Sequence, residues 1–136
     1  MMKLTQAQQA WIDDLLTTDA PQAREALRTK YGFCCLGRAC VILDTPVHTV
    51  EGSLETTHYG VPGDNDPTEL PVYVAAQLGL KDQGGKFDRN LLTDAWKAEI
   101  SPNRWQLLTQ LNDTALWPFE KIGRFIQDNP EAVFAQ

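Results

Sequence analysis

The pattern of hydrophobic positions shows a clear helical period near the N-terminus. Trp11 and Leu15 belong to an apolar face that recurs every three to four residues, as expected for an amphipathic helix. Thr5 and Gln8 precede this face at the spacing of a capping box, in which each side chain can bond the backbone N–H of the other residue. The pattern therefore predicts a first helix that starts after Thr5 and ends at residues 17–19.

The most apolar stretch of the chain covers residues 33–43. Its apolar side chains keep the i, i+3, i+4, i+7 spacing of one helix face at Leu36, Ala39, Cys40 and Leu43. This spacing predicts a buried helix over residues 34–43. Gly37 lies inside it, where glycine costs stability relative to alanine. We therefore expect Gly37 to mark the close approach of another backbone segment.

Two segments beside this apolar stretch lack a helical period. Residues 20–30 fit either a helix that begins at Pro21 or an extended arm that leads into a turn at Tyr31 and Gly32. Residues 47–61 are rich in Val, Thr and Tyr, and they alternate loosely between apolar and polar positions. This composition predicts a small antiparallel hairpin.

Three further helices are predicted in the second half of the chain. The first covers residues 70–78 and ends at Gly79, which suits the left-handed conformation of a helix C-cap. The second begins at Ser101, which is followed by proline as helix starts often are. The third opens at Pro118 and ends at residues 129–130.

These elements predict an α+β fold, with about five helices packed around a small antiparallel β-hairpin and a helix-rich C-terminal half. A chain of 136 residues has the length of one ordinary domain and can bury a sizeable core. We therefore expect a single compact domain over residues 1–136. No stretch approaches the ~18 apolar residues of a membrane span, and the first residues lack the apolar core of a signal peptide. The expected location is the cytoplasm, without membrane contact.

The net charge of −6 originates in one part of the chain. Residues 44–70, called the acidic segment below, contain six acidic residues and no Lys or Arg, while the remainder holds twelve acids and twelve bases. This balance disfavours direct nucleic-acid binding, which needs a basic surface. One short basic cluster is expected to form a solvated face: Arg24, Arg28, Lys30 and Arg38.

The acidic segment is also a long, turn-rich stretch, and loops on a rigid scaffold often carry function. It is expected either to attract a basic surface of a partner protein or to act only as a solvated loop. In the first case the contacts would come from four carboxylates: Glu51, Glu55, Asp64 and Asp66. Trp96 and Trp117 depart from the regular helical periods, and we predict them as further anchors for a partner.

The three cysteines, Cys34, Cys35 and Cys40, are predicted to be reduced and structural, because they are odd in number and clustered in the apolar stretch. The alternative hypothesis is a cysteine-dependent hydrolase of the peptidase or amidase type. A thiol of Cys34 or Cys35 at a helix N-terminus would then be the nucleophile. The other groups would be His48 or His58 as the base and Asn65 or Asp44 as its orienting partner.

Residues 64–69 are rich in oxygen ligands, as calcium loops are, but they lack the glycine and the final glutamate of an EF-hand. Turn chemistry and a helix start, with Asp66 as N-cap and Glu69 at the third position, explain the same residues. The sequence therefore predicts no metal site. It also lacks the phosphate-loop and dinucleotide signatures, so no cofactor is expected.

Three stretches together resemble a family of small proteins encoded by bacteriophages and prophages. Residues 31–40 are similar to a Tyr-Cys-Cys-Leu-Gly-x-x-Cys element, and residues 70–80 to a Leu-Pro … Leu-Gly-Leu element. Residues 111–126 are similar to a Leu-Asn-Asp … Phe-x-x-Ile-Ala-x-x-Ile ending, although Gly123 stands where that pattern prefers Ala. The resemblance spans about residues 4–128.

This resemblance implies a phage or prophage accessory protein that acts in a bacterial cytoplasm, and it assigns no chemistry to any residue. The function expected from it is non-enzymatic binding of a host or phage macromolecule, with inhibition of a host defence as one role. The sequence leaves the oligomeric state and the identity of the partner open.

Overall fold

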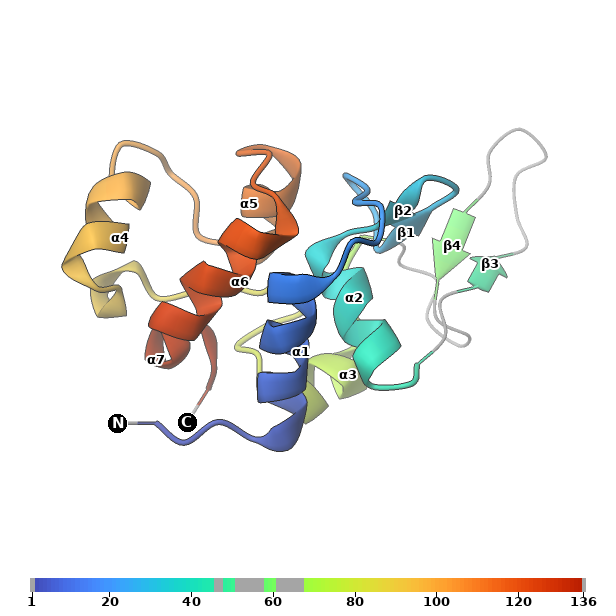
Figure 1. Cartoon of the computed structure of the whole chain (residues 1–136), viewed down its shortest axis with the longest axis horizontal. Helices are drawn as coiled ribbons and strands as arrows, with labels where there is room; N and C mark the ends of the chain where they lie inside the picture. Colours follow the sequence, from blue (N-terminus) through green and yellow to red (C-terminus); the bar gives the residue numbers. More distant parts are fainter. Residues whose placement is uncertain (1, 46–47, 51–57, 61–67, 136) are drawn as a thin grey trace.

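The computed structural model describes residues 2–45, 48–50, 58–60 and 68–135 (Figure 1). The α+β fold is confirmed, and the chain is rich in helix. The helices within these ranges are α1 Gln6–Thr17, α2 Cys35–Ile42, α3 Val72–Leu78, α4 Asp94–Ile100, α5 Leu108–Asp113, α6 Phe119–Asp128 and α7 Pro130–Val133, with a short 3-10 helix, η1 Arg89–Leu91. The strands are β1 Arg28–Thr29, β2 Gly32–Phe33, β3 His48–Val50 and β4 His58–Gly60.

Helix α1 begins with the predicted capping box. Thr5 Oγ1 accepts from the backbone N–H of Gln8 at 3.1 Å, and Gln8 Oε1 accepts from the backbone N–H of Thr5 at 2.9 Å. The buried Gln8 amide also donates from Nε2 to the carbonyl of Leu78 at 3.0 Å. One residue thus starts α1 and also ties it to the end of α3.

Helices α1 and α6 pack along each other near the middle of the molecule, as Figure 1 shows. Helix α6 follows Pro118 as predicted, and its apolar stripe is buried: Phe119, Ile122, Phe125 and Ile126. Helix α1 contributes Trp11, Ile12 and Leu15 to the same core. This continuous hydrophobic core extends to residues of α2, α3, α5 and α7.

Helix α2 confirms the buried helix predicted for the apolar stretch. It also confirms the predicted close approach of another backbone segment at Gly37. A Cβ atom built on Gly37 would lie 1.9 Å from the carbonyl oxygen of Leu27. No side chain can occupy that space, because the obstacle is backbone. The arm over residues 20–30 therefore crosses α2 at this glycine.

The same arm is extended, which decides between the two predicted alternatives. Its carbonyls and N–H groups pair with the start of the apolar stretch: Ala23 N–H donates to the carbonyl of Phe33 at 2.7 Å, and Phe33 N–H donates to that of Pro21 at 3.1 Å. Strands β1 and β2 then pair antiparallel, with Arg28 opposite Phe33. Because these backbone groups are already bonded to a distant segment, a helix from Pro21 does not form.

A second antiparallel pair, β3 and β4, confirms the predicted hairpin. His48 lies opposite Gly60, Thr49 opposite Tyr59, and Val50 opposite His58. Residues 51–57 of the predicted hairpin lie outside the described residues. The pair stands at one end of the molecule, far from α4 in the view of Figure 1.

Several helix boundaries in the second half differ from the predictions. Helix α3 ends at Gly79 in the predicted left-handed conformation, with φ of 75°. It starts only at Val72 after Pro71, so Glu69 is not its third residue. Asp66, its predicted N-cap, lies outside the described residues and precedes the helix by several positions.

Ser101 does not start a helix but ends one. Its N–H donates to the carbonyl of Lys97 at 2.9 Å, as the C-cap of α4. The pattern missed α4 because Ile100 is its one buried residue, too few to show a period. The helix predicted from Ser101 shortens to α5, because Leu107 stays extended and pairs with Lys86.

Candidate functional site

The three cysteines lie in the core around the start of α2. Cys34 is the N-cap of α2, and its Sγ accepts from the backbone N–H of Gly37 at 3.3 Å. Only 3% of Cys34 is exposed, and Cys35 and Cys40 are fully buried. The predicted structural role of the thiols is therefore supported by their position.

Burial also sets the protonation state of these thiols. Desolvation raises the pKa of Cys34 from 9.0 to about 12, although the Gly37 N–H partly opposes the effect. Burial likewise raises the pKa of Cys40 to about 11 and that of Cys35 well above its usual value. At neutral pH all three are neutral thiols, whereas a nucleophile needs an accessible thiolate. The helix N-terminus does not activate Cys34 as the hydrolase hypothesis requires.

We expect none of the three thiols to react with a disulfide reagent in the native protein at neutral pH, and all three to react in urea. The free energy of unfolding should also fall as pH rises above 9.0, because the Cys34 thiol then ionises in the unfolded chain but not in the folded one. Urea titrations across this range measure the slope. Rapid modification of native Cys34 or Cys35 would restore the hydrolase hypothesis.

The buried amide of Asn112 connects this cysteine region to the rest of the fold. Its Oδ1 accepts from Cys35 N–H at 3.1 Å and from Gln22 Nε2 at 2.8 Å. Its Nδ2 donates to the carbonyl of Ala23 at 2.9 Å and to Asp113 Oδ1 at 2.7 Å. Every hydrogen-bonding site of this fully buried side chain is occupied, so Asn112 holds α2, α5 and the extended arm together.

The other groups of the hydrolase hypothesis are not brought to the thiols by any described contact. His48 and His58 sit on β3 and β4, and their side chains are not among the described atoms. Asn65 lies outside the described residues, and Asp44 is an exposed residue just past α2. The predicted partner-binding acids fall outside the described residues as well: Glu51, Glu55, Asp64 and Asp66.

The structure corrects the prediction for Trp117, which is part of the core with 6% of its surface exposed. Its ring packs 5.8 Å from that of Phe125 and 6.3 Å from that of Trp105, centroid to centroid. Trp96 is half-buried beside it, with ring centroids 5.7 Å apart, and its Nε1 donates to Asp128 Oδ2 at 2.8 Å. Packing between segments far apart in the sequence buries Trp117 and partly covers Trp96, and neither position in the sequence indicated this.

The predicted basic face is partly neutralised within the fold. Arg38 forms two hydrogen bonds with Asp14, from Nε at 2.8 Å and from Nη2 at 2.6 Å. The guanidinium groups of Arg28 and Arg38 also lie 5.3 and 5.7 Å from the ring centre of Phe33. These cations support the β1–β2 hairpin, and they are not arranged as a free basic stripe.

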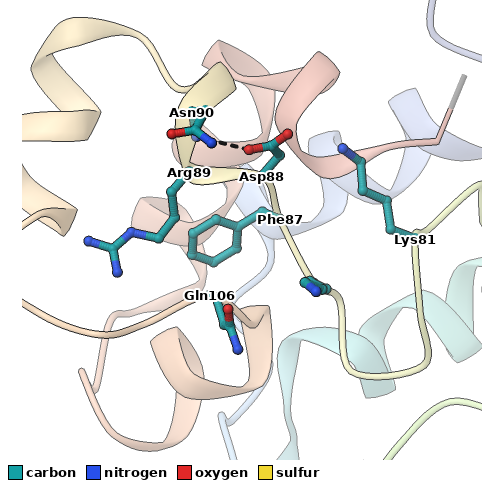
Figure 2. Close-up of a pocket in the computed structure, with 7 residues that line it drawn as sticks. Lys81, Phe87, Asp88, Arg89, Asn90 and Gln106 are labelled. Atoms are coloured by element: carbon teal, nitrogen blue, oxygen red, sulfur yellow. Dashed lines mark hydrogen bonds between the residues drawn. The ribbon is translucent and has the colours of Figure 1, made fainter.

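An open cleft of about 720 Å³ lies in the described surface, at a place where the sequence predicted no site. Figure 2 shows six of its residues labelled, with Lys81 on one side of Phe87 and Arg89 on the other. The lining residues are Lys81, Lys86, Phe87, Asp88, Arg89, Asn90 and Gln106. This group is called the basic cleft below, because three of its side chains are cations and one is an acid.

Long-range backbone bonds assemble the basic cleft. Phe87 N–H donates to the carbonyl of Gln106 at 2.9 Å, and Leu108 N–H donates to that of Gly85 at 2.9 Å. These bonds lay residues 81–90 against the start of α5. The sequence contained one sign of the basic cleft, namely three cations within nine residues around Gly84 and Gly85.

None of the helices in the described ranges has the length and apolar character needed to cross a membrane. A protein-family model, described as a domain of unknown function (DUF8296), matches residues 2–130. The chain therefore belongs to the DUF8296 family. No curated protein and no solved structure matches it.

Proposed function

We propose that this member of the DUF8296 family is a binding protein that acts on a macromolecular partner without cysteine chemistry. The observation that carries the proposal is the burial of all three thiols, whose raised pKa values keep them protonated. The cysteines instead serve the core: Cys34 caps α2, and Cys35 N–H bonds the Asn112 amide.

The partner in this proposal is a protein with a basic surface, and it meets the acidic segment. Support comes from the charge distribution, because that segment accounts for the whole net charge of −6. The hairpin β3–β4, which belongs to the segment, stands at one end of the molecule (Figure 1). A concentrated negative surface attracts a positive one at long range and speeds association.

The biological setting in this proposal is a phage or prophage accessory protein in a bacterial cytoplasm. It is supported by the resemblance of residues 31–40, 70–80 and 111–126 to such proteins. A protein of this kind could occupy the nucleic-acid-binding surface of a host protein and so inhibit a defence system. The acidic segment supplies the charge that such competition needs.

The test is a variant in which four carboxylates of the acidic segment are neutralised: Glu51→Gln, Glu55→Gln, Asp64→Asn and Asp66→Asn. In pull-downs from the bacterial host, we expect this variant to recover about tenfold less partner at low salt, because the attraction between the surfaces is electrostatic. Added salt should weaken capture by the wild type and change capture by the variant little.

A matched control removes four exposed acids elsewhere: Asp19→Asn, Glu25→Gln, Glu120→Gln and Glu131→Gln. This control changes the net charge by the same amount as the acidic-segment variant. It therefore separates the effect of the acidic segment from the effect of overall charge. Capture by the control should stay close to that by the wild type. Unchanged recovery and unchanged salt dependence with the acidic-segment variant would show that the partner binds elsewhere.

A further inference from the structure

The basic cleft carries positive charge on a chain that is negative overall. Its cations Lys81, Lys86 and Arg89 face one acid, Asp88, in a chain with a net charge of −6. Lysines on protein surfaces usually sit among compensating acids. A local excess of positive charge inside a hollow points to an anionic ligand.

The two lysines are free to bind such a ligand. Both are exposed, and within the described part of the chain neither Nζ has a hydrogen bond or an ion pair. The nearest acid in sequence, Asp82, does not line the cleft, and its Oδ1 accepts from the backbone N–H groups of Gly84 at 3.0 Å and Lys86 at 2.8 Å. By contrast, Lys121 is paired with Glu99.

Arg89 reaches the end of α4. Its Nη2 lies 3.5 Å from the carbonyl oxygen of Ile100 and 3.4 Å from that of Ser101. These contacts engage one nitrogen, and the remaining N–H groups have no other partner among the described residues. These remaining donors are available to an anionic ligand.

The floor of the basic cleft is rigid. Phe87 is 1% exposed and packs against Phe125 with ring centroids 4.9 Å apart. Asp88 N–H donates to the carbonyl of Ala132 at 2.9 Å, which ties the same backbone segment to α7. A preformed site of this kind does not need to be ordered when a ligand binds.

Asp88 provides the second chemical feature of the cleft. Its Oδ1 accepts from the backbone N–H of Asn90 at 2.9 Å, the bond drawn in Figure 2. Its other carboxylate oxygen has no hydrogen bond among the described residues. This oxygen can accept from a hydroxyl group, and the side-chain amides of Asn90 and Gln106 add neutral donors and acceptors nearby.

We propose that the basic cleft binds a small phosphate ester with hydroxyl groups, such as a sugar phosphate. The phosphate lies against the exposed Lys81 and Lys86, and a hydroxyl donates to Asp88, while Arg89 on the other side of Phe87 adds to the positive charge of the cleft. A phosphate monoester carries about −1.5 to −2 charges at neutral pH, which matches the excess of the cleft. A hollow of about 720 Å³ has the size of a small-molecule site, and the negative net charge opposes a long nucleic acid.

The test is isothermal titration calorimetry of the full chain with ribose 5-phosphate at low salt and neutral pH. The variant Lys81→Gln/Lys86→Gln should bind about tenfold or more weakly, because it loses two charge-assisted contacts to the phosphate. The control Lys3→Gln/Lys97→Gln removes two exposed lysines outside the cleft. Its affinity should stay within about twofold of the wild type.

Two competitors identify which part of the ligand is recognised. Ribose should not bind detectably, and inorganic phosphate should bind about threefold or more weakly than ribose 5-phosphate, because it offers no sugar hydroxyl to Asp88. Asp88→Asn keeps the oxygen that bonds Asn90 N–H, so the local structure should survive. This variant should lose the preference for the ester over inorganic phosphate.

Three results would overturn the proposal. The first is the absence of binding of millimolar ribose 5-phosphate to the wild type. The second is equal weakening by the two double-lysine variants, which would make the effect one of net charge alone. The third is equal affinity for inorganic phosphate and the ester, which would leave no role for Asp88.

Discussion

Replacement of Gly37 by alanine is expected to lower the free energy of unfolding by about 3 kcal/mol or more, because it overpacks a rigid contact. The new Cβ would lie 1.9 Å from the carbonyl oxygen and 2.9 Å from the carbonyl carbon of Leu27. Both atoms belong to the backbone of the extended arm, so no side-chain rotation can relieve the clash. The arm or α2 must shift instead.

Urea unfolding followed by tryptophan fluorescence measures this loss. Gly84→Ala is the matched control, because a Cβ at Gly84 would meet only side-chain atoms, the nearest 3.6 Å away. Its stability should stay within about 0.5 kcal/mol of the wild type. A Gly37→Ala variant as stable as this control would show that the arm does not cross α2 at this point.

Replacement of Asn112 by alanine should cost about 3 to 4 kcal/mol, because buried polar groups that lose their partners each cost about 1–3 kcal/mol. Cys35 N–H and the carbonyl of Ala23 would both be left without their bonds to the Asn112 side chain. We expect the extended arm to loosen as well. The amide proton of Cys35 should then exchange faster with solvent, relative to protons of α6.

Asn103→Ala is the comparison for this second experiment. The Asn103 side chain makes no hydrogen bond within the described residues, although its backbone N–H donates to the carbonyl of Ile100. Loss of the Asn103 side chain should change the unfolding free energy by about 0.5 kcal/mol or less. If Asn112→Ala proves equally mild, the Asn112 amide does not hold the arm in place.

The signals that succeeded in the sequence are local ones. The capping box of Thr5 and Gln8, the left-handed Gly79 and the start of α6 after Pro118 each depend on residues within one or two helical turns. The apolar stretch also predicted buried thiols, because its composition alone demands burial. Gly37 correctly predicted a close backbone contact, because glycine costs stability inside a helix and is expected there where a neighbouring segment leaves no room for a side chain.

The predictions that failed or stayed open concern segments whose conformation is set from far along the chain. Residues 20–30 fit a helix or an arm equally well, and Phe33 and Asn112 select the arm through hydrogen bonds. Leu107 stays extended because it pairs with Lys86, so the helix expected from Ser101 starts only at Leu108. Trp117 is covered by Trp96 and Trp105.

Local sequence was therefore sufficient for the α+β class, for most of the longer helices and for the burial of the cysteines. It was not sufficient for the basic cleft, in which the segment with Lys81, Lys86 and Arg89 meets Gln106. That meeting depends on two backbone hydrogen bonds, Phe87 to Gln106 and Leu108 to Gly85, which leave no periodic trace in the sequence. A helix start is encoded by neighbours within a few residues, whereas a cleft depends on contacts that only the folded chain creates.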